Sequence, residues 1–207
     1  MSAFKVYGNA RGKMAGMSHI SIAVGQSPVC NTCKMGKICY GKRIYTHVRE
    51  SYLGNGEKLT SKVFDKCDLP VVNTITCRFN AFGELFTGKK GVIQLTNYVN
   101  TALKNPRTTF VLWSRNYRLV ESYFKTNEKP SNMRLIRSTV DIDCPVSTIP
   151  QCWDGVFNVL SKEYTEKHGV NINCGMVDND GQPIGCMTCP TGCYTEGKKV
   201  VCYEVVK

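Results

Sequence analysis

This sequence lacks the patterns that identify several common classes of protein. No apolar run approaches the ~18 residues of a membrane-spanning helix, and the opening stretch "MSAFKVYGNARGKMAGMSHI" has no apolar core of a signal peptide. Neither a G-x-G-x-x-G fingerprint nor a phosphate-binding P-loop is present. Internal repeats and low-complexity segments are also missing. These absences predict a cytoplasmic protein without a membrane partner, folded as one domain over 1–207, and they disfavour a nucleotide-binding Rossmann protein.

Acidic residues are few compared with basic ones. The chain has 27 Lys and Arg against 16 Asp and Glu, which gives a formal net charge of +11. Such an excess is typical of proteins with an anionic partner, here a nucleic acid or an anionic small molecule. The basic residues are spread along the chain and form no compact run, so an ordinary solvated surface is the alternative.

Cysteine, in contrast, is abundant, with twelve residues in 207. A chain of this length can bury a core without disulfides. In a reducing compartment, clustered cysteines more often bind metal or carry out redox chemistry than form disulfides. We therefore expect ligand groups rather than a disulfide framework.

Seven of these cysteines fall into two groups, each of which contains a C-x-x-C step. The first group is Cys30, Cys33 and Cys39 in segment 30–40, and the second is Cys174, Cys186, Cys189 and Cys193 in segment 174–194. C-x-x-C spacing lets two thiolates converge on one metal centre. The sequence leaves open whether the groups share one centre or build two. The remaining cysteines are expected to be free thiols, with Cys77 in the core: Cys67, Cys77, Cys144, Cys152 and Cys202.

Two kinds of metal centre fit the second group. Three close cysteines with a distant fourth, Cys174, are typical of an iron–sulfur cluster of the four-iron, four-sulfur type. Four cysteines also suit a structural zinc site. The three histidines share no Cys-His finger spacing with either group. An iron–sulfur protein is the first prediction, and a zinc-stabilised basic protein that binds nucleic acid is the alternative.

Apolar patterns alternate between the period of strands and the period of helices. Val92, Leu95, Val99 and Leu103, for example, form a helical stripe. Short connections between such elements predict βαβ units and a parallel sheet. We predict an α/β fold, an incomplete parallel β/α barrel with Cys-rich segments at both ends, and take an open doubly wound sheet as the alternative. The predicted strands are 19–25, 73–80, 108–113, 132–139, 154–160, 169–174 and 198–206. The predicted helices are 37–53 (ended by Gly-Asn-Gly at 54–56), 91–106, 116–124 and 161–168.

Polar residues gather where three of the predicted strands end. In parallel sheets these carboxyl ends form the edge that carries sites. The arginines suit a carboxylate or phosphate ligand, Glu84 is the local candidate for acid–base chemistry, and the others are candidates for ligand binding. Solvated loops and capping residues are the alternative for each. The candidates are Arg78, Asn80 and Glu84, then Ser114 and Arg115, then Arg137 and Ser138.

The order of these motifs over 18–205 resembles the phage "gene product 88" family, which is largely uncharacterised. The resemblance rests on "KICYGKR", "CRFNAFGEL", "NPRTTFVLWSRN", "SNMRLIRST" and "GCMTCPTGCY". It implies a bacteriophage protein in the cytoplasm of an infected bacterial host. The chain departs from the family pattern at Gly41 (where the family has Ala), Asn80 (His) and Glu84 (Asp).

The family is in turn similar, at a distance, to radical S-adenosylmethionine barrels. Both have a cysteine motif after the first strand, followed by βα units. That similarity implies redox or radical chemistry at the carboxyl ends of the strands. The diagnostic C-x-x-x-C-x-x-C triplet is absent here, since two residues separate Cys30 from Cys33 and five separate Cys33 from Cys39.

Overall fold

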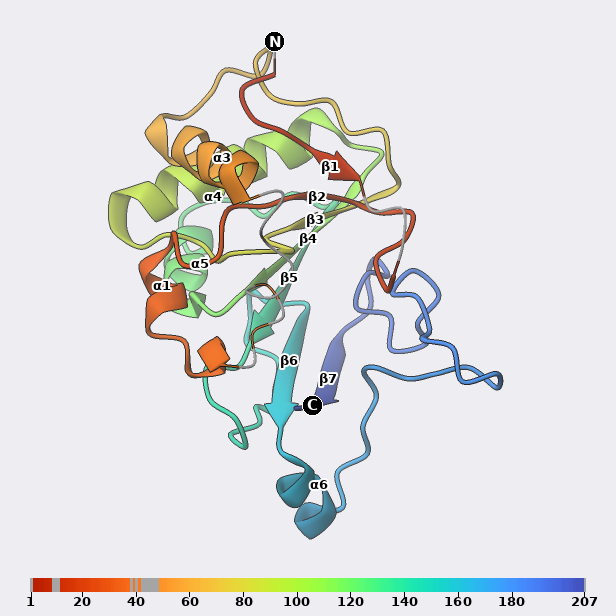
Figure 1. Ribbon diagram of the computed structural model, residues 1–207. Coiled ribbons are helices and arrows are strands. Elements are labelled where there is room, and N and C mark those ends of the chain that lie inside the picture. Colours follow the sequence, from red (N-terminus) through yellow and green to blue (C-terminus); the bar gives the residue numbers. More distant parts are fainter. Residues whose placement is uncertain (1, 9–11, 38, 40, 42–48, 207) are drawn as a thin grey trace.

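The computed structural model describes residues 2–8, 12–37, 39, 41 and 49–206. Its centre is a seven-stranded sheet whose strands lie side by side in sequence order (Figure 1). The first two strands are antiparallel, and every later neighbouring pair is parallel. The strands are β1 (Tyr7–Gly8), β2 (Ser18–Ile20), β3 (Thr76–Phe79), β4 (Thr109–Ser114), β5 (Met133–Ser138), β6 (Gly155–Leu160) and β7 (Val200–Val205).

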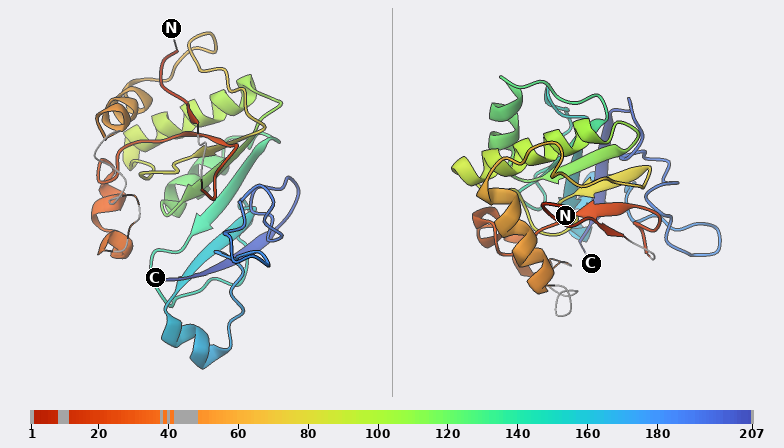
Figure 2. Two further views of the ribbon diagram at one scale, coloured as in Figure 1. Left: turned by 45° about the vertical axis from the view of Figure 1, so that its right-hand side comes forward. Right: turned by 90° about the horizontal axis from the view of Figure 1, so that it is seen from above.

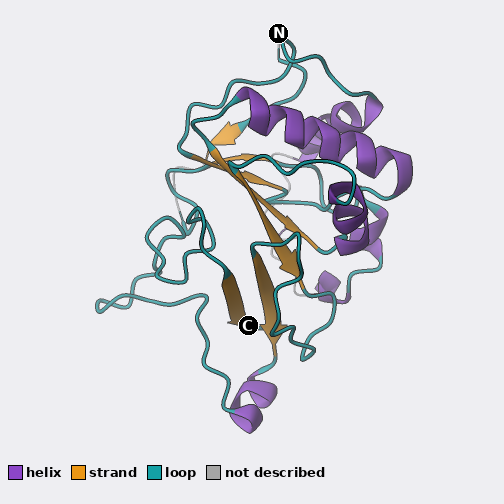
Figure 3. Ribbon diagram, turned by 180° about the vertical axis from the view of Figure 1, so that it is seen from behind, coloured by secondary structure: helices purple, strands orange, loops and turns teal. Residues whose placement is uncertain are grey.

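The larger helices cover one face of this sheet. Figures 1 and 2 place α3 (Arg49–Ser61), α4 (Gly88–Lys104) and α5 (Tyr117–Phe124) together on one side, and Figure 3 shows the same arrangement from behind. Among the described helices, none combines the length and apolar character needed to cross a membrane. The helices are α1 (Pro28–Asn31), α3 (Arg49–Ser61), α4 (Gly88–Lys104), α5 (Tyr117–Phe124) and α6 (Lys162–His168), with a 3-10 turn η1 (Lys34–Lys37).

The predicted α/β class and the mostly parallel sheet are confirmed. In the part of the chain that the structure describes, β7 does not pair with β1, so the sheet is open. The strand order contains no reversal, and the sheet therefore lacks the switch point of a doubly wound fold. Sequential right-handed crossovers place successive helices on the same face, as observed.

The main core lies between the sheet and its helices. Strand β4 sends Phe110 and Leu112 into it, and α4 contributes Leu95 and Tyr98, all with 0% exposure. The predicted stripe of α4 is correct at Leu95 and Val99. It is wrong at its ends, because Val92 is 43% and Leu103 is 57% exposed. Tyr98 and Ala102 complete the buried face instead, which rotates the stripe slightly around the helix axis.

A second core lies on the opposite face of the sheet. Strand residues Val111, Ile136 and Phe157 point toward this side and pack with Met17 and Cys202. The covering layer contains no large helix. It includes the segment before β2, the segment after α1 with Cys33 and Met35, and the long C-terminal connection between α6 and β7, which Figure 2 shows beside the sheet. This layer carries the second cysteine group.

The predicted helix end at 54–56 is wrong, because α3 continues through Gly54, Asn55 and Gly56 to Ser61. Tertiary contacts outweigh the local glycine signal. Asn55 Nδ2 donates to the carbonyl oxygens of Lys5 (3.2 Å) and Ser21 (3.0 Å). A Cβ at Gly56 would lie 2.1 Å from the side chain of Gln26, so glycine permits this close approach. Of the predicted helix 37–53, residues 38, 40 and 42–48 lie outside the described residues.

The predicted strand 169–174 is also wrong, since the segment is an irregular connection. Gly169, at φ 61°, ends α6 in a left-handed conformation. The Asn173 side chain then occupies the edge of β7, donating to the Val201 carbonyl (2.9 Å) and accepting from the Tyr203 amide (2.8 Å). A side chain therefore satisfies backbone groups that a neighbouring strand would otherwise pair.

Two helical glycines provide a stability test of this packing. A Cβ at Gly91 in α4 would lie 2.2 Å from the Phe86 carbonyl oxygen, whereas Gly54 in α3 has nothing within 4 Å. Gly91→Ala is expected to lower the free energy of unfolding by about 2 kcal/mol through overpacking, and Gly54→Ala to raise it by about 0.5–1 kcal/mol. Urea unfolding of both variants measures the difference. Equal effects would contradict the packing at Gly91.

Candidate metal centre

Five of the twelve cysteines line one small cavity on the face of the sheet opposite the helices. The cavity has a volume of about 40 Å³, enough for an ion or a few waters. Four of these cysteines belong to the predicted second group, and the fifth is Cys202 of β7. The lining residues are Trp113, Asn173, Cys174, Cys186, Cys189, Thr191, Cys193, Tyr194 and Cys202.

Cys202 is the centre of this cluster. It forms side-chain hydrogen bonds with both Cys174 and Cys193, and these bonds lower the pKa of the Cys174 and Cys193 thiols. The same contacts, followed by burial, raise the pKa of Cys202. Cys174 and Cys193 therefore lose a proton more readily than Cys202 does. Residues from the sheet and from the C-terminal connection thus meet in one thiol network.

The two C-x-x-C cysteines behave differently from this trio. Burial raises the pKa of Cys186 to about 11, although the charges of Arg78 and Lys13 oppose the shift. Cys186 packs against the second core, and its amide donates to the Lys13 carbonyl oxygen (2.7 Å). Cys189 lines the cavity but is not among the residues of that core.

Three cations lie near the cysteines of the cavity. The charge of Lys13 lowers the pKa of Cys186 and also that of Cys174, where the charge of Glu204 opposes it more strongly; Arg134 lowers the pKa of Cys193. Arg78 lies with its guanidinium 4.7 Å from the ring centroid of Trp113. Positive charge so placed favours thiolates over thiols, which is the condition for binding a metal ion.

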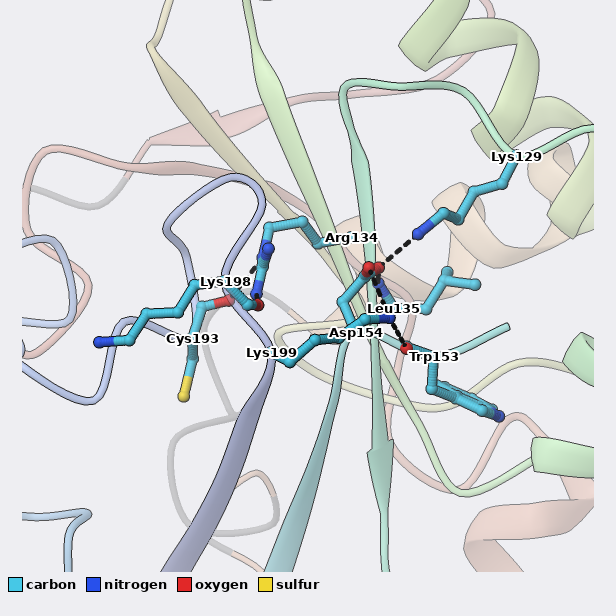
Figure 4. Close-up of polar contacts among 8 residues, drawn as sticks. All are labelled: Lys129, Arg134, Leu135, Trp153, Asp154, Cys193, Lys198 and Lys199. Carbon is cyan, nitrogen blue, oxygen red and sulfur yellow. Dashed lines mark hydrogen bonds and ion pairs between the residues drawn. The ribbon is translucent and has the colours of Figure 1, made fainter. Parts of the chain in front are cut away.

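Arg134 fixes the loop that carries Cys193 (Figure 4). The arginine is 3% exposed; its Nε donates to the Cys193 carbonyl oxygen (3.0 Å) and Nη2 donates to that of Lys198 (2.5 Å). Figure 4 shows the Cys193 sulfur pointing away from Arg134, so the contact orients the backbone and leaves the thiol for the cavity. Burial lowers the pKa of Arg134, and the charge of Asp154 opposes this.

The anchor of this loop can be tested by substitution. Arg134→Met is expected to lower the free energy of unfolding by about 2 kcal/mol, because two charge-assisted hydrogen bonds are lost while a buried charge is relieved. Arg137→Met on the same strand is the control. Arg137 stacks on Tyr117 (4.2 Å) and lies 3.7 Å from a Glu121 oxygen at the half-exposed outer face, so a loss of about 1 kcal/mol or less is expected. Denaturant titration of both variants decides, and an Arg134→Met loss no larger than that of Arg137→Met would contradict the anchoring role.

The first cysteine group lies at the carboxyl edge of the sheet. Ser27 caps α1, accepting from the Val29 amide and donating to the Leu85 carbonyl oxygen (2.6 Å), which ties the cysteine helix to the loop after β3. Burial raises the pKa of Cys30 to about 11, and the charges of Glu84, Cys33 and Cys39 add to the rise. The three thiols are therefore neighbours, but no hydrogen bond joins them as it joins the C-terminal trio.

The two groups occupy separate places. Figures 1 and 2 show α1 on one side of the molecule and the C-terminal connection on the other. Cys33 does reach the second core, in which Cys193 and Cys202 are buried. None of the first group lines the cavity. Among the described residues, no set of three or more His, Cys, Asp or Glu side chains is arranged to hold a metal ion as the side chains stand. All twelve cysteines are free thiols.

Glu84 and Ser114 meet at the carboxyl edge, as their positions after neighbouring strands led us to expect. The Glu84 carboxylate accepts from Ser114 Oγ (2.6 Å), the Arg115 amide (2.7 Å) and the Leu85 amide (2.8 Å). Burial raises its pKa, and these three donors oppose the rise. The contacts make Glu84 a buried brace between two strand ends, close enough to affect the titration of Cys30.

The three candidate arginines at this edge, Arg78, Arg115 and Arg137, in contrast, do not lie together. Arg78 and Arg134 are both in register with Val111 and share the face that carries the cavity. Arg137 lies three residues beyond Arg134, so it points to the other face, where it stacks on Tyr117. Arg115 contacts Glu84 through its backbone amide. The structure therefore does not place these arginines around one anion.

The other two edge candidates are buried. Asn80 is 3% exposed and has φ 53°, a left-handed conformation unusual for a residue other than glycine. Its Oδ1 accepts from Tyr98 Oη (2.8 Å), and among the described residues its Nδ2 has no hydrogen-bond partner. Ser138 is 5% exposed at the end of β5.

The residue that the cysteine pattern missed is Cys202. Its signal is the period of two in β7, which places Val200 and Cys202 on one face. Knowing which face it is requires the register with β6, where Cys202 pairs with Phe157 of the second core.

No protein-family model, no curated protein and no solved structure matches this chain.

Proposed function

We propose that this chain is a cysteine-ligated metalloprotein. In this proposal an iron–sulfur cluster on Cys30, Cys33 and Cys39 carries out redox chemistry at the carboxyl edge, and a thiolate site in the C-terminal connection holds further metal. One observation carries it: five cysteines from three parts of the chain line one cavity beside Lys13, Arg78 and Arg134. Neutral thiols that serve only packing have no need of nearby cations.

The arrangement of the first group supports an iron–sulfur cluster. Cys30 feels the charges of Cys33 and Cys39 without hydrogen-bonding to them. Each thiolate of a four-iron, four-sulfur cluster binds a different iron, so the ligands are spread around the cluster rather than in mutual contact. The group also lies where parallel sheets carry their sites. A backbone amide at Gly25 also donates to the Cys30 sulfur, which favours the Cys30 thiolate.

An incomplete β/α barrel is the finer fold proposal. Sequential strand order and helices on one face support it, because both are features of such barrels. The face without helices corresponds to the interior of a barrel, and here it is filled by Met17, Met35 and the C-terminal cysteines. The Cys-rich connection would then take the place of the missing strands.

Metal analysis of the full chain, purified without oxygen, tests the proposed function. We expect iron with acid-labile sulfide, and broad absorbance near roughly 400 nm from thiolate-to-iron charge transfer. Cys30→Ser/Cys33→Ser should lose the iron and sulfide. Cys67→Ser/Cys152→Ser is the matched control, because it removes two cysteines outside both groups and should retain them. A colourless wild-type protein without bound metal, or a Cys30→Ser/Cys33→Ser protein with unchanged iron and sulfide, would overturn the proposal.

A further inference from the structure

The C-terminal cavity differs from the first group in how closely its sulfurs lie. Cys174, Cys193 and Cys202 line the same cavity, and Cys202 shares side-chain hydrogen bonds with the other two. In a tetrahedral zinc site the Zn–S bonds are about 2.3 Å, so neighbouring sulfurs lie about 3.8 Å apart. This separation is that of thiols in contact. A four-iron cluster stands between its ligands and holds them farther apart, since each thiolate binds its own iron.

The size of the cavity leads to the same conclusion. A cavity of about 40 Å³ accommodates one ion among its five cysteines. The lining also limits expansion. Trp113 packs edge-to-face on Phe157 (centroids 4.9 Å apart), and the Arg78 guanidinium lies over its ring at 4.7 Å. Tyr194, 8% exposed, contacts Arg78 through its hydroxyl (3.4 Å).

The geometry points to a single-ion site of the zinc type, in which Cys174, Cys193 and Cys202 become ligands once their side chains turn toward the ion, and one thiol of the Cys186/Cys189 pair is the fourth. This inference rests on the part of the proposed function that places metal in the C-terminal connection. Binding releases the protons of the thiols and replaces the hydrogen bonds of Cys202 with metal–sulfur bonds. Lys13, Arg78 and Arg134 offset the negative charge of four thiolates around a divalent cation.

The ligand set connects three parts of the chain. Cys202 belongs to the sheet, Cys174 follows α6, and Cys193 lies in the loop that Arg134 anchors. In the described covering layer of this face, the 3-10 turn η1 reaches the core through Met35, and there is no helix of the length found on the other face. An ion bound here would therefore fasten an irregular connection to the sheet, as structural zinc sites do in segments with little regular structure.

Cobalt binding to the full chain is the test. Cobalt in a tetrahedral site of thiolates gives intense visible absorption bands, which report the ligands directly. Apoprotein prepared with chelator and reductant is titrated with Co²⁺, and the bands at saturation are compared among variants. We expect one equivalent at this site in the wild type and loss of at least ~90% of the bands in Cys202→Ser. Cys77→Ser is the matched control, because Cys77 is also fully buried within a strand, on the opposite face.

The shared fourth position makes a second prediction. Cys186→Ser and Cys189→Ser should each retain a tetrahedral cobalt spectrum, since either thiol can complete the site, whereas Cys186→Ser/Cys189→Ser should lose it. Near-ultraviolet circular dichroism shows whether each variant is folded without metal. If Cys202→Ser is unfolded, Cys174→Ser replaces it in the test. It changes a half-buried loop residue and should also lose the cobalt bands.

Three results would overturn the inference. One is a Cys202→Ser spectrum equal to that of Cys77→Ser, the second is a C-terminal site that binds iron together with inorganic sulfide, and the third is retention of the bands in the Cys186→Ser/Cys189→Ser protein. In each case the chain still binds metal, so the broader proposal stands. A wild-type protein that takes up no cobalt, zinc or iron would remove both.

Discussion

Replacing Glu84 with glutamine is expected to lower the free energy of unfolding by about 3–4 kcal/mol. The carboxylate is 5% exposed and accepts from Ser114 Oγ, the Arg115 amide and the Leu85 amide at 2.6–2.8 Å. An amide group would turn two of its own protons toward one of these donors. At least one buried donor then loses its acceptor, and unsatisfied buried groups are among the larger single causes of destabilisation.

Glu121→Gln is the control for this experiment. Glu121 is half-buried and accepts from Trp153 Nε1 (3.0 Å), a contact that glutamine can keep through its carbonyl oxygen. Glu121→Gln should therefore lower the free energy of unfolding by about 1 kcal/mol or less. Urea titrations at neutral pH measure both variants. If Glu84→Gln and Glu121→Gln unfold at the same midpoint, the brace between the ends of β3 and β4 contributes nothing beyond a surface carboxylate.

The sequence predicted the regular half of the fold well. Strands β4 and β5 and helices α4 and α5 were located correctly because their apolar residues recur with the period of the element they form. The errors lie where tertiary contacts replace local signals. Asn55 hydrogen-bonds to two distant carbonyl groups and keeps α3 helical through Gly54 and Gly56. Asn173 pairs with β7 through its side chain and leaves 169–174 without a ladder.

The candidate site was predictable in part for a related reason. Close spacing identified Cys186, Cys189 and Cys193, because ligands near one another in sequence are near one another in space. Cys202 has no such neighbour, and only the sheet register brings it to Cys174 and Cys193. The arginines show the converse error. Arg78 and Arg137 lie near the carboxyl ends of β3 and β5, on either side of β4, but the alternation of strand side chains sends them to opposite faces.

His19 has surroundings that predict a second large effect, in acid. The side chain is 2% exposed on β2 and lies among aromatic rings, with centroids 5.3 Å from Tyr7 and 5.5 Å from Phe82. Its Nδ1 is 2.8 Å from Ser21 Oγ, which already accepts the Phe82 amide and so has its own proton to offer the ring. Burial lowers the pKa of His19 to about 4, and the charge of Arg78 adds to the shift. The imidazole is therefore neutral in the folded protein.

A depressed histidine pKa makes stability depend on pH in one direction. Above pH 6.5 the imidazole is neutral in both states, and its full contribution to stability is present. As the pH falls from 6.5 toward 4, the unfolded chain takes up a proton that the folded chain does not, so the unfolded state gains. A difference of about 2.5 pKa units corresponds to about 3 kcal/mol lost by pH 4.

Comparison with His19→Gln separates this loss from the titration of carboxylates. The variant should be less stable at pH 7.5, because glutamine cannot fill the aromatic site, but its free energy of unfolding should fall by about 3 kcal/mol less than that of the wild type between pH 7.5 and pH 4. His168→Gln, a change at an exposed residue of α6, is the control and should follow the wild-type pH dependence. Carboxylates contribute equally to all three proteins, so the difference between curves reports His19 alone. Parallel curves for the wild type and His19→Gln would show that the ring is protonated in the folded state as readily as in the unfolded chain, and that the aromatic enclosure does not exclude charge.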